Sequence, residues 1–156
     1  MKNDWDITKV LWQILNRTKL ACEIDGRGRQ GGFLCIKDSF GKTVLVAMLG
    51  EVSDSEKALK YMAFCQEKAQ RLHLNVANGH ISSWQSRNEQ EEKYGGGIID
   101  SKGRIFAFSG LSEHLDEALS LDIARQLDDS SLGRSRIEGI RGFSANPFIE
   151  YFLPGL

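Results

Sequence analysis

The sequence predicts an α+β domain in which helices pack on one antiparallel β-sheet of about four to five strands. Two pairs of short apolar segments are each joined by a turn with the pattern Asp-Ser-x-Gly-basic, at residues 38–42 and 100–104. Each pair runs into a glycine and then into a segment with helical periodicity, which carries Glu-Lys-Ala-Leu at 56–59 or Asp-Glu-Ala-Leu at 116–119. These observations indicate two β-hairpin–helix units, preceded by a further helix and sharing one sheet. We expect the helices to cover one face of that sheet.

Length and composition are those of a globular domain. The chain has 156 residues, of which 41% are hydrophobic and 26% are charged, and this length is sufficient for one domain with its own core. The net charge of -1 provides no basic surface for nucleic acid or for an anionic membrane. We therefore expect one domain over residues 1–156, with its core at about 5–129 and an irregular C-terminal tail at 130–156.

Neither the N-terminal residues nor the cysteines indicate secretion. Residues 1–6 lack the basic and apolar segments of a signal peptide, and no apolar run approaches the ~18 residues of a membrane span. The three cysteines, Cys22, Cys35 and Cys65, are odd in number and form no Cys-x-x-Cys pair. We expect no disulfide framework, no cysteine zinc site and a cytoplasmic location.

The first third of the chain reads as a helix, a loop and a hairpin. Apolar residues at helical spacing predict a helix from residue 5 to about 20, with Asp4 and Asp6 at its positive end. Residues 26–32 contain four glycines and two arginines; they form either an exposed mobile connection or a cradle for an anion. Apolar runs at 33–36 and 43–49 predict strands that are covered on both faces.

Two further helices follow. Ser53 and Glu56 have the spacing of a capping box, and the helix that they open is expected to bury Leu59, Met62, Cys65, Ala69 and Leu72. Ser112 is the expected N-cap of the next helix, whose buried face carries Leu115, Leu119, Ile123 and Leu127. Between the two helices, residues 73–93 lack a clear period. The aromatic tail either packs back on the domain or docks on a neighbouring subunit.

Short motifs recur in a defined order in both halves of the chain. In the first half, Asp38-Ser39-Phe40-Gly41 lies between two strands and Glu67-Lys68-Ala69 lies in the following helix. In the second half, Tyr94-Gly95-Gly96-Gly97-Ile98 precedes the hairpin. Ser109-Gly110-Leu111 follows that hairpin, and Asp116-Glu117-Ala118 lies in the next helix.

In their order and spacing these motifs resemble the GlcG/HbpS-like family, over about half of the chain. Members of that family bind haem, are proposed to degrade it, or form the C-terminal domain of a corrinoid adenosyltransferase. The resemblance implies a profilin-like or PAS-like fold, assembly into homo-oligomers, and haem or another tetrapyrrole as a ligand.

The candidate ligand-binding residues lie beside the second hairpin. His114, in the opening turn of a helix, is either a ligand to haem iron or an anionic group, or a surface histidine. Gly95, Gly96 and Gly97 either let backbone amides approach a propionate, phosphate or carboxylate, or adopt backbone dihedral angles that a loop requires. Tyr94 stacks on a planar ligand or covers the core. The candidate set is Tyr94, Gly95, Gly96, Gly97, Ser109, Gly110 and His114.

No motif in the sequence indicates catalysis or a protein-bound metal. There is no Gly-x-Ser-x-Gly sequence, and His73 and His80 do not have the spacing of metal ligands. The first functional hypothesis is therefore a non-catalytic, oligomeric protein that binds a small molecule, either a tetrapyrrole such as haem or another planar anion. The second is a structural or protein-interaction module that uses the tail at 143–156 and the first helix. The third is an enzyme that acts on a small metabolite.

Overall fold

The computed structural model describes residues 7–155, and its centre is a four-stranded antiparallel sheet. In spatial order the strands are β2 (Thr43–Glu51), β1 (Gln30–Lys37), β4 (Ile105–Ser109) and β3 (Gly97–Ile99). The two hairpins, β1–β2 and β3–β4, meet where β1 pairs with β4, with Cys35 opposite Ala107. The predicted α+β class is confirmed.

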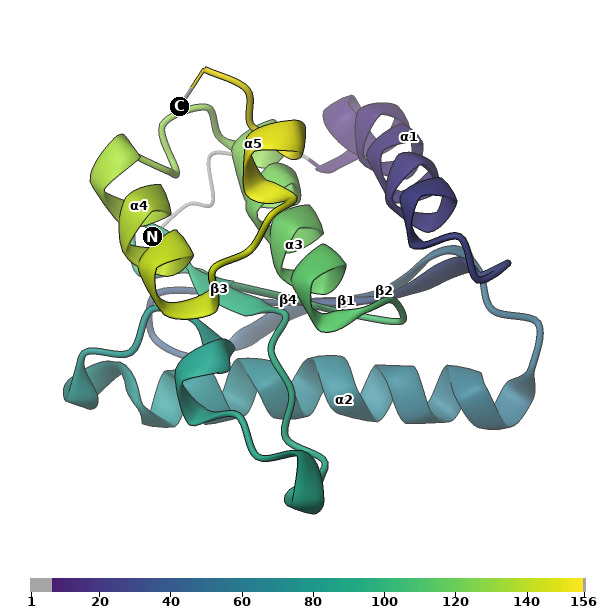
Figure 1. The fold of residues 1–156 in the computed structure, drawn as a ribbon, viewed down its shortest axis with the longest axis horizontal. Helices are drawn as coiled ribbons and strands as arrows, with labels where there is room; N and C mark the ends of the chain where they lie inside the picture. The colour runs from purple at the N-terminus through teal and green to yellow at the C-terminus, as the bar shows by residue number, and fades with distance from the viewer. Residues whose placement is uncertain (1–6, 156) are drawn as a thin grey trace.

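Helices cover both faces of this sheet, so our expectation of helices on one face only was wrong. Figure 1 shows α2 (Ser55–Leu74) beneath the sheet and the other four helices above it: α1 (Ile7–Asp25), α3 (Glu113–Leu127), α4 (Arg134–Ser144) and α5 (Ile149–Phe152). The reason lies in the central strands, because β4 is fully buried along its length. Phe106 and Phe108 pack in the core on the α3 side, whereas Ile105 and Ala107 pack in the core against α2.

The edge strand β2 is less covered than its apolar sequence predicts. β1 is buried over most of its length, but β2 has one fully buried residue, Leu49. Since α2 lies mainly under β1 and β4, the α2-facing side of β2 remains partly open to solvent.

The two Asp-x-x-Gly turns have the predicted geometry. Gly41 and Gly103 each have φ of +83°, in the left-handed region that glycine enters without a Cβ penalty. The Asp38 carboxylate accepts hydrogen bonds from the backbone N–H groups of Phe40 and Lys42. Asp100 accepts the equivalent pair from residues 102 and 104. Both aspartates therefore stabilise turns.

The cap of α2 differs from the predicted one, whereas the predicted N-cap position of α3 is confirmed. Asp54, and not Ser53, caps α2, and its carboxylate accepts a hydrogen bond from the Lys57 backbone N–H at 3.0 Å. Ser112 is the N-cap residue of α3, but its side chain makes no capping bond. The expected role of Asp4 and Asp6 falls outside the described residues.

The buried faces of α2 and α3 match the prediction in most positions. In α2, Cys65, Ala69 and Leu72 are buried and Met62 is partly buried, but Leu59, near the start of the helix, is 64% exposed. All four apolar residues predicted for the buried face of α3 are buried.

The C-terminal segment is ordered into α4 and α5, so the prediction of an irregular tail was wrong. Ile137 and Ile140 of α4 are buried, and Phe152 and Leu153 at the end of α5 are also buried. These contacts are made with residues distant in the sequence and therefore leave only a weak local signal. None of the described helices is long and apolar enough to cross a membrane.

Replacing Gly110 with alanine should destabilise the fold by about 2 kcal/mol or more. Gly110 has φ of +150°, and a Cβ there would lie 2.8 Å from the Gly32 Cα and 2.9 Å from the Gly31 carbonyl oxygen. Urea unfolding measures the loss. Gly142→Ala is the control: it lies in α4 with open space around it and should raise stability slightly. An equal effect of both substitutions would contradict this explanation.

Candidate functional site

The structure brings the predicted ligand-binding residues together at the N-terminal end of α3. The Gly95 backbone N–H donates to the Glu113 carboxylate at 2.8 Å. Gly96 lies against Asp116 and Lys68, and Ser109 and Gly110 form the connection from β4 toward α3. The clustering expected from the motif order is therefore present.

The protein's own side chains fill the space that these glycines leave. A Cβ on Gly95 would lie 2.4 Å from the Trp84 ring, and one on Gly96 would lie 2.8 Å from the Lys68 Nζ. The Gly97 N–H donates to the Ser83 hydroxyl. Tyr94 packs edge-on against Phe64, with ring centroids 5.6 Å apart. The glycine run accommodates internal packing at this point.

His114 makes two contacts within the protein. Its ring stacks on Trp84 at a centroid distance of 4.5 Å and an interplanar angle of 10°. Its Nε2 lies 2.9 Å from the Ser144 carbonyl oxygen, to which it donates. One ring face and one ring nitrogen are thus in use. Among the described residues, no group of three or more histidine, cysteine or acidic side chains has the arrangement of a metal site.

A buried ion pair lies behind the glycine run. Lys68 of α2 donates to the Asp116 carboxylate of α3 at 3.0 Å and to the Phe108 carbonyl oxygen at 2.9 Å. The other carboxylate oxygen of Asp116 accepts from the Leu111 N–H. Burial raises the pKa of Asp116 to about 6, although Lys68 acts in the opposite direction. The pair joins the helices on the two faces of the sheet.

Glu117, the neighbouring acid, is also fully engaged. Its carboxylate accepts hydrogen bonds from the Ser82 hydroxyl at 2.6 Å, the Ser144 hydroxyl at 2.5 Å and the Asn146 amide at 3.0 Å. Burial raises its pKa. These contacts fix the C-terminal helices to α3, and they indicate a structural role for the carboxylate.

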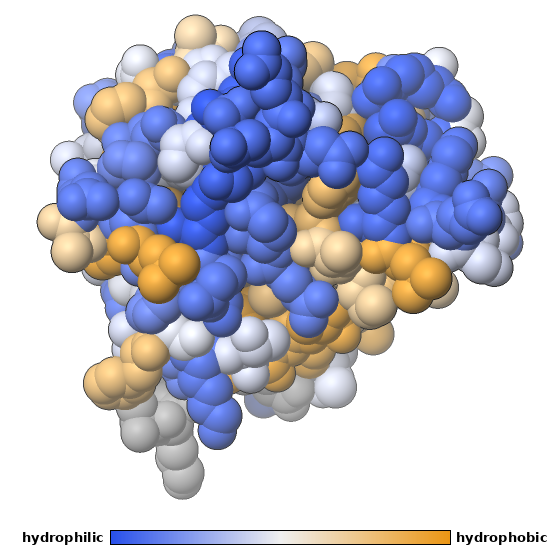
Figure 2. Space-filling model, turned by 90° about the horizontal axis from the view of Figure 1, so that it is seen from below, coloured by the Kyte–Doolittle hydropathy of each residue, from blue (hydrophilic) through white to orange (hydrophobic). Residues whose placement is uncertain are grey.

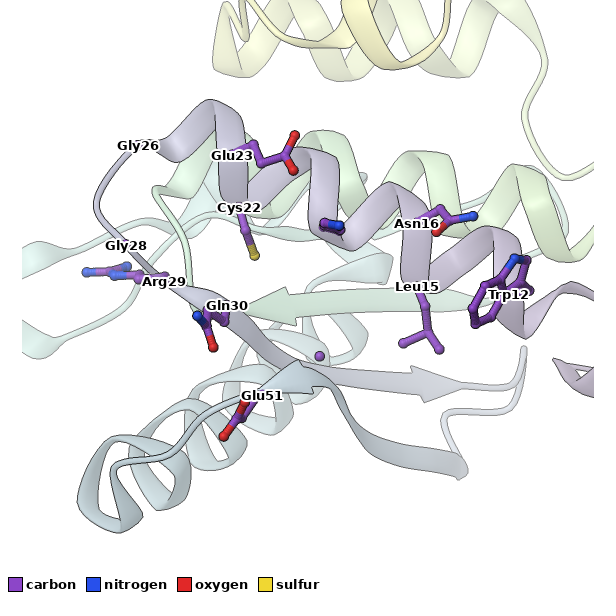
Figure 3. A pocket seen from close by; sticks show the side chains of 12 residues that line it. Trp12, Leu15, Asn16, Cys22, Glu23, Gly26, Gly28, Arg29, Gln30 and Glu51 are labelled. Carbon is purple, nitrogen blue, oxygen red and sulfur yellow. The ribbon is translucent and has the colours of Figure 1, made fainter.

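A large cavity lies elsewhere, between α1 and the open end of the β1–β2 hairpin, and we call it the α1 cleft (Figure 3). Its volume is about 810 Å³, within the range of ~300–1,000 Å³ that is usual for ligand sites. It is lined by Trp12, Leu15, Asn16, Lys19, Cys22, Glu23, Gly26, Gly28, Arg29, Gln30, Gly50 and Glu51.

The α1 cleft follows from the amphipathic placement of α1. Ile14, Thr18 and Ala21 are buried, and α1 packs extensively on α3. The cleft residues of α1 recur at spacings of three and four on another face of the same helix, which looks toward the β2 edge. Gly50 and Glu51, at the end of β2, complete the lining. In Figure 3, Leu15 and Cys22 point from α1 toward the strands.

The α1 cleft has an apolar interior and a charged rim. Trp12, Leu15 and Cys22 supply the apolar surface. Lys19 and Arg29 contribute cations to the lining, and Glu23 and Glu51 contribute carboxylates. Burial raises the pKa of the Cys22 thiol to about 11, so this sulfur stays protonated and is a poor nucleophile. An apolar interior with a charged rim is a composition suited to binding a small molecule.

A smaller cavity of about 440 Å³ lies on the other side of the loop at 26–29. Here Arg29 donates to the Gly110 carbonyl oxygen at 2.8 Å and lies 5.9 Å from the centroid of the Tyr61 ring. Arg27 binds both carboxylate oxygens of Asp25. The two arginines of the proposed anion cradle therefore already have partners within the chain, although both also line this smaller cavity.

None of the seven residues predicted as ligand-binding lines the two cavities beside this loop. Sequence reasoning missed the α1 cleft because its lining combines one helix face, a loop and the end of a distant strand. The available signal was a second apolar group in α1, Trp12 and Leu15, outside its buried stripe. Comparison with known proteins adds no assignment, since no family model, curated protein or solved structure matches this chain.

Asp116→Asn should change how stability depends on pH. The Asp116 carboxyl has a pKa of about 6 in the folded state, whereas an unfolded aspartate has a pKa of ~3.9. The folded state therefore binds the proton more tightly, and the contribution of Asp116 to the free energy of unfolding increases as the pH falls. The stability of the native protein relative to the variant should therefore be greater at pH 5 than at pH 7.5, by roughly 1–2 kcal/mol.

Urea unfolding of both proteins at the two pH values measures this difference. Glu117 is present in both proteins and its contribution cancels. A difference that does not change with pH would show that Asp116 titrates normally and would contradict the effect of burial.

Proposed function

We propose that this protein is a non-catalytic binding protein for a small planar molecule, held in the α1 cleft. The observation that carries the proposal is the combination of a cavity of about 810 Å³ with an apolar interior and charged groups at its rim. An apolar interior with a few polar groups is the usual composition of a small-molecule site.

The expected ligand has a flat apolar body and an anionic group. Trp12 is 76% exposed and offers an aromatic face at the entrance, while Leu15 and Cys22 offer apolar contacts deeper in the cleft. Lys19 supplies positive charge for a carboxylate or a similar group, with Arg29 beside it, while Glu23 and Glu51 in the same lining can accept hydrogen bonds from N–H groups of a ligand. A metal-free tetrapyrrole is one member of this class.

Haem itself is less well supported. His114, the iron ligand that the family resemblance suggests, does not line the α1 cleft, and no other histidine does. Cys22 lines it, but the raised thiol pKa disfavours the thiolate that binds iron. We therefore propose a ligand class without iron coordination.

A non-catalytic role is supported by the position of the perturbed acids. Asp116 and Glu117 have raised pKa values, a property that is common in active sites. Here both carboxylates are buried and hydrogen-bonded to the protein, and neither lines the α1 cleft. Their pKa values follow from structural burial.

A second candidate function, a protein-interaction module, is favoured by exposed aromatic residues on the last two helices. Phe143 is 52% exposed and Tyr151 is 59% exposed, whereas the neighbouring Phe152 is buried. The tail thus packs on the domain and still presents two aromatic side chains. Replacing both exposed side chains with serine would remove this surface without disturbing the core.

The binding proposal is tested by titrating the protein with protoporphyrin IX and following tryptophan fluorescence. We expect saturable quenching, and we expect Asn16→Arg to weaken binding about tenfold or more, because a longer side chain there occupies part of the cleft. Asn16 is exposed on α1, so the substitution leaves the core intact.

Gln13→Arg is the matched control, since Gln13 is exposed on the same helix and does not line the cleft. His114→Ala should also leave the affinity unchanged. Quenching that is not saturable, or that is weakened by His114→Ala and not by Asn16→Arg, would contradict the assignment of the site.

A further inference from the structure

The smaller cavity beside the loop at 26–29 has charged groups of both signs in its lining. Its volume is about 440 Å³, and it lies between that loop, the end of β2 with its connection to α2, and the first two turns of α2. We call it the α2 cavity. Figure 2, viewed from the α2 side, shows that the surface where α2 begins (right) is largely hydrophilic. The charged residues in the lining are Arg27, Arg29, Lys57, Glu51 and Asp54.

Most of these charges are not neutralised by the chain itself. Arg27 is the exception, because it forms an ion pair with Asp25. The other charged side chains of the lining form no ion pair within residues 7–155, either with one another or with any other side chain; they are Arg29, Lys57, Glu51 and Asp54. Two cations and two carboxylates therefore line one cavity without pairing across it.

The Arg29 guanidinium is held in place but keeps its charge. Its Nη1 donates to the neutral Gly110 carbonyl oxygen at 2.8 Å, and its central carbon lies 5.9 Å from the centroid of the Tyr61 ring. Neither partner carries a negative charge that would neutralise the guanidinium. Its Nε and Nη2 have no hydrogen-bond partner in the described part of the chain. A guanidinium with two such nitrogens can donate to both oxygens of one carboxylate.

The two carboxylates also have free acceptor oxygens. Asp54 is fixed as the cap of α2, where its Oδ1 accepts from the Lys57 backbone N–H at 3.0 Å. Its Oδ2 and both carboxylate oxygens of Glu51 accept no hydrogen bond from the residues that the structure describes. Ionised carboxylates only accept hydrogen bonds, and an ammonium group offers three donors. These oxygens are therefore suited to an ammonium group.

We propose that the α2 cavity binds a small zwitterion, a free α-amino acid. Its carboxylate binds Arg29 and Lys57, and its ammonium group binds Glu51 and Asp54. A ligand with a single charge would leave two like charges of the lining beside it, which disfavours binding, whereas a zwitterion complements both pairs. The volume lies toward the lower end of the ~300–1,000 Å³ that is usual for ligand sites, as suits a small ligand.

The α2 cavity is a second site, and its occupancy does not depend on the ligand proposed for the α1 cleft. The two cavities share part of the loop and the end of β2, since Arg29 and Glu51 line both. Asp54, Lys57 and Tyr61 line the α2 cavity and not the α1 cleft. The tests below therefore use substitutions of α2 and its cap, and they contain no protoporphyrin IX.

The first test is the thermal unfolding of the full chain in the presence of each protein-forming L-amino acid in turn. We expect at least one of them to raise the Tm in a saturable manner, because a ligand that binds the folded state stabilises it. At about one hundred times its Kd, the ligand should raise the Tm by roughly 5–10 °C. Ammonium acetate at the same concentration is the control, since it supplies the two charges on separate ions.

The second test measures whether both charges of the ligand are needed. The amino acid that binds is titrated by calorimetry beside its methyl ester, which lacks the carboxylate, and its N-acetyl derivative, which lacks the ammonium group. We expect each derivative to bind about tenfold more weakly or worse, because each leaves one pair of charged side chains without a partner.

The third test locates the site. Asp54→Asn removes a charge and keeps the helix cap, because asparagine caps helices as well as aspartate does. Lys57→Gln removes a charge from an exposed position. Each substitution should weaken binding of the amino acid by about tenfold. Glu56→Gln and Lys60→Gln are the matched controls, since both residues are exposed on the same helix and do not line the cavity; they should leave the affinity unchanged.

Three results would overturn the proposal. They are a Tm that no amino acid raises beyond the effect of ammonium acetate, a methyl ester or N-acetyl derivative that binds as tightly as the free amino acid, and an affinity that Asp54→Asn and Lys57→Gln change no more than their controls do. A protein that binds an amino acid and not protoporphyrin IX would support this site and contradict only the ligand of the α1 cleft, so the two proposals fail separately.

Discussion

The buried ion pair between Lys68 and Asp116 is the interaction on which the arrangement of this fold depends. A sheet covered on both faces separates its two helical layers, and this pair connects them beside Gly96, where the absence of a side chain leaves room. Both side chains are almost completely buried, so removing one partner would leave the other charge uncompensated, at a cost of about 3–5 kcal/mol. Gly96 in the glycine run therefore leaves space for the buried Lys68–Asp116 ion pair.

Buried acidic side chains that bind distant partners also occur along the rest of α3, the most buried of the described helices. Its acidic residues, and Asp128 just after it, bind partners from elements distant in the sequence. Glu113 binds Arg87, Asp122 binds Arg17 of α1, and Asp128 binds Lys102 and Arg104 of the second turn. A helix that is apolar on one face and acidic on the others can therefore be buried on all sides, because each acidic side chain has a specific hydrogen-bond donor. The carboxylates with shifted pKa values are thus held by partners within the protein.

The proposed binding site lies on a side of the molecule that this network does not reach. The α1 cleft adjoins the open edge of β2 at Gly50 and Glu51, away from the crowded N-terminal end of α3. In this region the helices leave β2 partly uncovered.

The sequence by itself determined the hairpins, their Asp-x-x-Gly turns, the approximate ranges of α1, α2 and α3, and the α+β class, because these depend on local periodicity and turn chemistry. Only the tertiary structure decided what surrounds Gly96 and where the cleft lies. Lys68 and Asp116 are far apart in the chain, and nothing local indicates that they meet. The helices at 134–152 likewise owe their order to burial against distant residues. Local sequence patterns specify individual helices and strands. The cavities between helices and strands depend on long-range packing, and candidate binding sites lie in those cavities.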